Sequence, residues 1–176
     1  MYLWGELSMI TRHFQQAAML WAIFGGMGLL LIAALTTTNV GAFAIDRAAR
    51  SFGTTVSALP GYEDSVRLAI SCAALMFFPY CQLMRGHVVV DVLSARMSDK
   101  TQHALNIFSL ILTVLLALFL AYWMLFGMLE THADAAVSRV LGWPEWPFYI
   151  PGIASLVLWA LIALAQIFGL KSKTND

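Results

Sequence analysis

Four histidines are the residues of this chain best suited to hold a haem iron or a metal ion. A membrane haem needs paired axial ligands at matching depth in the membrane. His13, His87 and His103 stand at the ends of long apolar runs, and His132 belongs to the opposite side of the membrane. The sequence therefore predicts no haem, no metal and no other cofactor.

Nucleophilic side chains are present, but none has a base within reach. Hydrolysis inside a membrane would need such a base beside the nucleophile. Ser71 and Ser109 have no histidine at a comparable depth. Cys72 and Cys81 lie in one apolar run, where cysteine usually behaves as a small apolar residue. We therefore expect neither enzymatic activity nor a functional disulfide.

The amino-acid composition indicates that transmembrane helices hold these histidines, serines and cysteines in place. The chain has 176 residues, of which 60% are hydrophobic and 11% are charged, whereas soluble domains carry about 25% charged residues. A helix needs about 20 residues to cross a hydrocarbon core of about 30 Å. We therefore predict an all-α membrane protein, a single domain of residues 1–176, with short interfacial amphipathic helices. Its four transmembrane helices are predicted at about 14–38, 66–84, 102–129 and 147–170.

The apolar runs at 14–38, 68–84, 104–129 and 147–170 contain no Asp, Glu, Lys, Arg or His. Ionisable residues at membrane depth usually mark an ion path, a proton relay or a substrate site. Their absence argues against a self-sufficient pump or ion-coupled carrier. The uncharged polar residues inside the runs are expected to form hydrogen bonds between helices; they are Ser71, Gln82, Asn106, Ser109, Thr113, Ser155 and Gln166.

The second predicted helix has two features of its own. Pro79 lacks a backbone N–H, so we predict a kink near Leu75 and Met76. Glu63 and Arg67 lie four residues apart at its start, which predicts an ion pair along the helix.

The first predicted helix and its continuation leave two alternatives open. Ala18, Ala22 and Gly26 recur every four residues and predict a face for close helix packing, although small residues are also simply common in membrane helices. Residues 40–52 are amphipathic, and either extend this helix or lie along the membrane surface.

Charge distribution predicts the orientation and limits the partners. Six basic residues fall on the side of the two termini and four on the other, so we predict cytoplasmic termini. A formal net charge of zero provides no basic stripe for nucleic acid. The surrounding partner is the lipid bilayer.

Residues 85–91, Arg-Gly-His-Val-Val-Val-Asp, form a polar hinge between the second and third predicted helices. The hinge resembles the Gly-His-Ile-x-Val-Asp signature of the small membrane subunit (DctQ type) of tripartite ATP-independent periplasmic (TRAP) transporters. Gly86, His87 and Asp91 match the signature, and Val88 replaces its isoleucine. The four-helix layout and the acidic start of the second helix at 62–64 are also similar, whereas the long segment 39–61 departs from the pattern.

This resemblance implies a protein of the bacterial inner membrane. Its partners would be a large membrane subunit, which carries the sodium and substrate sites, and a periplasmic binding protein that delivers an organic acid. The small subunit would brace the scaffold of the large one. The alternative is a membrane anchor of a redox or other membrane enzyme complex, for which a haem spectrum would be diagnostic.

Two sets of residues become candidate interaction sites on this basis. Arg85, Gly86, His87 and Asp91 are expected to dock the large subunit, or alternatively to serve only as a topology signal and a solvated pair. Acidic residues of the outer loops are expected either to contact the binding protein or to be merely solvated; the candidates are Glu63, Asp64 and Asp134.

Overall fold

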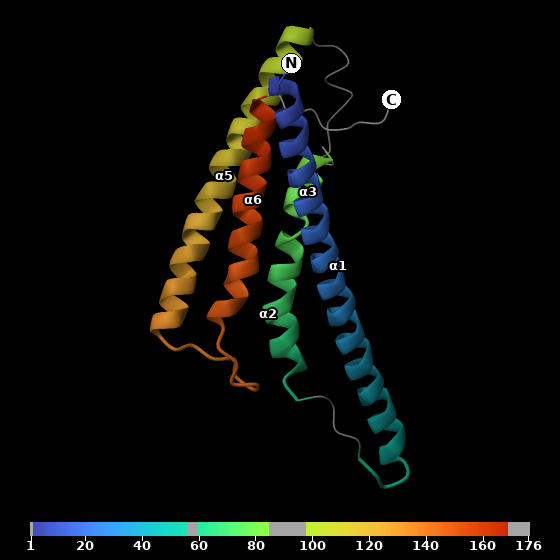
Figure 1. Ribbon diagram of the computed structural model, residues 1–176. Helices are drawn as coiled ribbons and strands as arrows, with labels where there is room; N and C mark the ends of the chain where they lie inside the picture. Colours follow the sequence, from blue (N-terminus) through green and yellow to red (C-terminus); the bar gives the residue numbers. More distant parts are fainter. Residues whose placement is uncertain (1, 56–59, 85–97, 169–176) are drawn as a thin grey trace.

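Figure 1 shows a computed structural model of the chain, in which residues 2–55, 60–84 and 98–168 are described. Its helices are α1 (Tyr2–Arg50), α2 (Tyr62–Leu75), α3 (Phe78–Leu83), α5 (Asp99–Ala133), the short 3-10 helix η1 (Trp146–Phe148) and α6 (Tyr149–Ile167). Four helical segments are long and apolar enough to cross a membrane: Phe14–Arg50, Tyr62–Leu83, Lys100–Ala133 and Trp146–Ile167. The predicted fold class is therefore confirmed.

The helices lie side by side, with α6 between α5 on one flank and α2 and α3 on the other (Figure 1). Helix α1 packs against α2 and α3. The first turns of α1 and the last turns of α6 lie at the same end of the molecule, which we call the terminal end (Figure 1). The opposite end, where α1 and α5 finish and α2 and α6 begin, is called the loop end.

Helix α1 is continuous over 49 residues, about 73 Å at 1.5 Å per residue. The threonine run at 36–38 is helical, and the hydroxyls of Thr36 and Thr38 are satisfied within the helix by donating to the carbonyls of Ile32 and Ala34 at 2.8 Å. The helix ends at Arg50, near Gly53 with its φ of +76°. Residues 40–50 thus extend the first helix, and the last turns of α1 project past α2 at the loop end (Figure 1).

The predicted kink at Pro79 is confirmed as an interruption between α2 and α3, at Met76 and Phe77, which keep right-handed helical backbone angles. Proline cannot donate to the carbonyl four residues before it, which is that of Leu75, the last residue of α2. Together Tyr62–Leu83 comprise 22 residues, or about 33 Å, which matches a hydrocarbon core of about 30 Å.

Uncharged polar side chains join the helices inside the apolar runs. Gln82 Nε2 donates to Gln166 Oε1 at 2.8 Å, and Trp159 Nε1 donates to Gln82 Oε1 at 3.0 Å. Trp21 Nε1 donates to Ser155 Oγ at 2.7 Å. The expected interhelical role is confirmed for Gln82, Ser155 and Gln166, and these bonds tie α6 to α1 and α3.

Helix α1 comes close to α2 at Gly25. A Cβ added there would lie 2.8 Å from the Cβ of Met76 and 3.1 Å from the carbonyl oxygen of Ala73. A Cβ added at Gly26 would meet nothing within 4 Å in the described structure. Of the predicted packing face, Ala18 is fully buried and Ala22 is half-buried.

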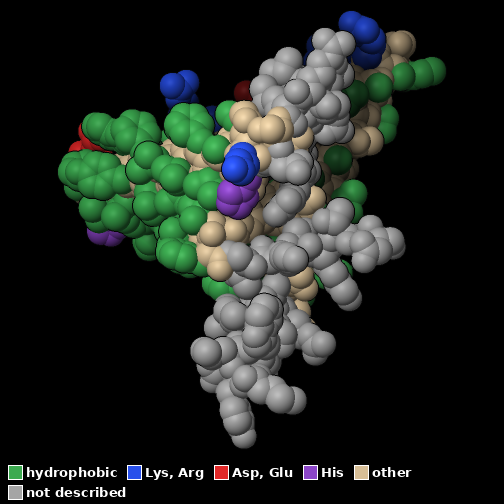
Figure 2. Space-filling view, turned by 90° about the horizontal axis from the view of Figure 1, so that it is seen from above, with side chains coloured by type: hydrophobic (Ala, Val, Ile, Leu, Met, Phe, Trp, Pro, Cys, Tyr) green, Lys and Arg blue, Asp and Glu red, His purple; other side chains and the backbone are tan. Residues whose placement is uncertain are grey.

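Helix α5 contacts mainly α6 and leaves most of its surface uncovered. Seen from the terminal end, hydrophobic side chains gather over the α5 side of the molecule (Figure 2). They include an aromatic group in mutual ring contact, formed by Phe119, Tyr122, Trp123 and Phe126. Such a surface suits a lipid environment or an apolar partner.

Candidate interaction site at the loop end

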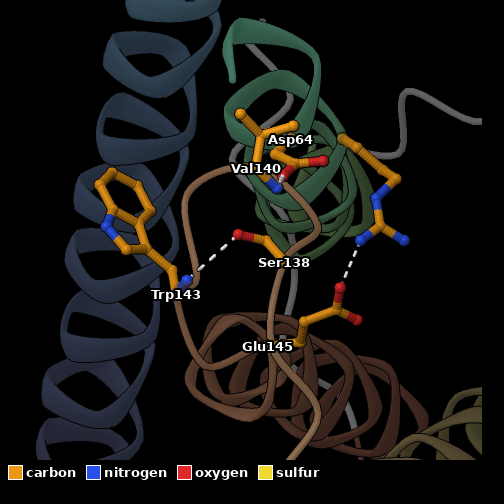
Figure 3. A network of polar contacts seen from close by, with 6 residues as sticks. Asp64, Ser138, Val140, Trp143 and Glu145 are labelled. Atoms are coloured by element: carbon orange, nitrogen blue, oxygen red, sulfur yellow. Dashed lines mark hydrogen bonds and ion pairs between the residues drawn. The ribbon is translucent and has the colours of Figure 1, made fainter. Parts of the chain in front are cut away.

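The segment between α5 and α6, residues 134–145, is folded into a compact turn that we call the anchored loop. Ser138 organises it and is only 2% exposed. Its backbone N–H donates to the carbonyl of Trp143 at 2.8 Å, and its hydroxyl accepts from the Trp143 N–H at 3.1 Å (Figure 3). Gly142 permits the tight return with a φ of +65°. The loop therefore presents a defined shape.

Asp64, in the first turn of α2, fixes this loop to the neighbouring helix. Its Oδ2 accepts the backbone N–H of Val140 at 2.8 Å (Figure 3). Gly61, with a φ of +75°, lies directly against the loop, because a Cβ added there would stand 2.7 Å from the side chain of Leu141. Asp64 is only 8% exposed, so its carboxylate has a structural role in holding Val140.

A second link runs from Arg67 to Glu145, whose side chains form an ion pair (Figure 3). The predicted pair between Glu63 and Arg67 is therefore wrong. A pair along one helix is worth only a few tenths of a kcal/mol, and Glu145 from the anchored loop lies within reach. The Arg67 side chain is 59% exposed, so this pair orients the loop more than it stabilises the fold.

The anchored loop and the head of α2 line a half-open cavity of about 540 Å³. Phe43 of α1 also lines it, as do Arg139 and Val140 of the loop. This arrangement contains two guanidinium groups, two carboxylates and an aromatic side chain. It is suited to binding a ligand or partner by charge, and it offers no nucleophile with a base.

The predicted site residues differ in where they lie and in what they contact. The hinge residues Arg85, Gly86, His87 and Asp91 lie outside the described part of the chain. Of the acidic candidates, Glu63 and Asp134 are exposed at the loop end, whereas Asp64 is engaged beneath the anchored loop. Within the described residues no group of three or more His, Cys, Asp or Glu side chains could hold a metal ion.

Sequence reasoning missed several contacts that build the site. Ser138 was not singled out, because a lone serine in a loop has no distinguishing signal. The indole N–H groups of Trp21 and Trp159 were also missed as interhelical donors. A signal did exist for the tryptophans, since a buried indole usually finds a hydrogen-bond acceptor.

Comparison with known proteins finds one family. A family described as "Tripartite ATP-independent periplasmic transporters, DctQ component" matches residues 40–172, which is more than half of the chain. The matched range includes the hinge, the anchored loop and every helix except most of α1. No curated protein and no solved structure matches.

Proposed function

Since this chain belongs to the DctQ component family of TRAP transporters, we propose that it braces the transporter from within the membrane. It is the small permease subunit, a multi-pass membrane protein and a transporter component, not an enzyme. We propose that it supports the scaffold of a large membrane subunit during sodium-coupled uptake of an organic acid. A periplasmic binding protein would deliver that acid.

This proposal rests on the polar side chains inside the membrane-spanning helices, which are uncharged and form hydrogen bonds between helices. The apolar runs lack ionisable residues, and Gln82, Trp159 and Gln166 use their polar atoms to hold helices together. A carrier that moved an ion or an acid through this chain would need charged or open polar groups at that depth. Satisfied interhelical hydrogen bonds favour a rigid support.

The loop end is proposed to face the periplasm, with both termini in the cytoplasm. Exposed Glu63 and Asp134 then remain candidate contacts for the binding protein. The bond from Asp64 to Val140 supports a different role for Asp64, which is to hold the anchored loop in the shape that the binding protein would meet.

The hinge at 85–91 is proposed to dock the large subunit on the cytoplasmic side. The test replaces Asp91 by Ala or Lys and His87 by Ala, with exposed Lys100→Ala as a control on the same side. We expect the hinge variants to lose co-purified large subunit and sodium-driven uptake in parallel, while the control retains both.

Uptake measured at several sodium and substrate concentrations separates bracing from transport. Bracing predicts a lower maximal rate with unchanged substrate and sodium affinity, because fewer complexes assemble. If the complex stayed intact while either affinity changed, the hinge would belong to the transport path and the bracing role would be refuted.

A further inference from the structure

The length of the α2–α3 segment predicts that the cavity at the loop end lies near the depth of lipid headgroups. Tyr62, Glu63 and Asp64 line it, and they are the first residues of the 22-residue segment Tyr62–Leu83. Because that segment spans about 33 Å, close to the hydrocarbon thickness of about 30 Å, its first turn falls at the membrane boundary. The volume of about 540 Å³ is within the range of about 300–1,000 Å³ seen for ligand sites.

Four charged side chains line the cavity, and two of them are already committed. Asp64 accepts the Val140 N–H, and Arg67 is paired with Glu145. Glu63 and Arg139 are exposed and form no ion pair with any residue in the described ranges. The cavity therefore offers one available anion and one available cation.

An apolar side chain stands beside these charges. Phe43 of α1 is 55% exposed and lines the same cavity. A purely ionic ligand would not use this ring, whereas a molecule with a charged head and an apolar body would cover it. An aromatic ring and two opposite charges near the membrane boundary together suit an amphiphilic ligand.

We propose that this cavity binds the headgroup of a zwitterionic phospholipid of the ethanolamine type. Arg139 binds the phosphate, because a guanidinium matches phosphate oxygens in a bidentate manner. Glu63 accepts hydrogen bonds from the primary ammonium, and the acyl chains enter the bilayer beside Phe43. Phosphatidylglycerol carries the same phosphate but a neutral glycerol headgroup, which offers Glu63 no cation, and the trimethylated ammonium of phosphatidylcholine offers Glu63 no N–H donor.

Native mass spectrometry of the purified protein in detergent tests this binding with defined probes. The probes are phosphatidylethanolamine, phosphatidylcholine, phosphatidylglycerol and inorganic phosphate. We expect the wild type to retain one phosphatidylethanolamine in preference to the other two lipids, with no displacement by millimolar phosphate. Equal retention of all three lipids, or a preference for phosphatidylglycerol, would overturn the proposal, and displacement by phosphate would indicate a free-anion site instead.

Variants then assign the headgroup contacts. Arg139→Gln should lower phosphatidylethanolamine retention on the order of tenfold, as expected for the loss of a charged hydrogen-bond donor, and Arg139→Lys should lower it less. Glu63→Gln should shift the preference toward phosphatidylglycerol. Arg47→Gln and Glu130→Gln change exposed charges outside the cavity and serve as matched controls. Equal effects of the cavity and control variants would refute the assignment, and the wild-type comparison tests the site even if a variant misfolds.

Discussion

The contact of Gln82 with α6 allows a quantitative test of how the helices hold together. Gln82 is 5% exposed; its side chain donates to Gln166 and accepts from Trp159, at 2.8 and 3.0 Å. Leucine is similar in size and removes both bonds. Interhelical hydrogen bonds in membranes average about 0.6 kcal/mol and reach about 1.7, and a buried donor that loses its acceptor costs about 1–3. We expect Gln82→Leu to cost about 1–3 kcal/mol.

Reversible unfolding in mixed micelles measures this cost. Asn106→Leu is the matched control, because Asn106 is exposed on α5 and makes no hydrogen bond to another helix among the described residues. A double-mutant cycle with Trp159→Phe isolates the pair. Trp159→Phe should cost less in the Gln82→Leu background than alone. Additive effects, or an equal loss for the Asn106 control, would show that this hydrogen bond does not couple α3 to α6.

Three further outcomes are expected. Gly25→Ala should destabilise the protein by about 1–3 kcal/mol through overpacking, because its Cβ would lie 2.8 Å from another side chain; Gly26→Ala, with open space, should be nearly neutral in the same unfolding assay. Asp64→Ala should speed amide hydrogen exchange in the anchored loop, and Asp64→Asn, whose amide oxygen can still accept, should speed it less; unchanged exchange would show that this carboxylate does not hold the loop. In a background without native cysteines, a cysteine at exposed Val137 should label from outside intact cells and one at exposed Lys100 should not; the reverse pattern would invert the proposed orientation.

Apolar run length was sufficient to predict the four membrane-spanning helices, whereas the extension of α1 over residues 40–50 was left open. In hydrocarbon, every backbone N–H and C=O must be satisfied within the segment, so a run of about 20 apolar residues can only be helical. Pro79 interrupts the second helix after Leu75, where its missing N–H predicted a kink. The uncharged polar residues Gln82, Ser155 and Gln166 were likewise predicted as interhelical contacts, because a polar atom at that depth needs a partner.

Only the tertiary structure decided which residues of different elements come into contact. Each residue along a helix turns the side chain by about 100°, so Gly25 and its neighbour Gly26 point in different directions and only Gly25 meets α2. Arg67 was within reach of Glu63 by spacing, yet it pairs with Glu145, 78 positions away in the sequence. Helix rotation and loop path set these contacts, and no periodicity within one helix records them.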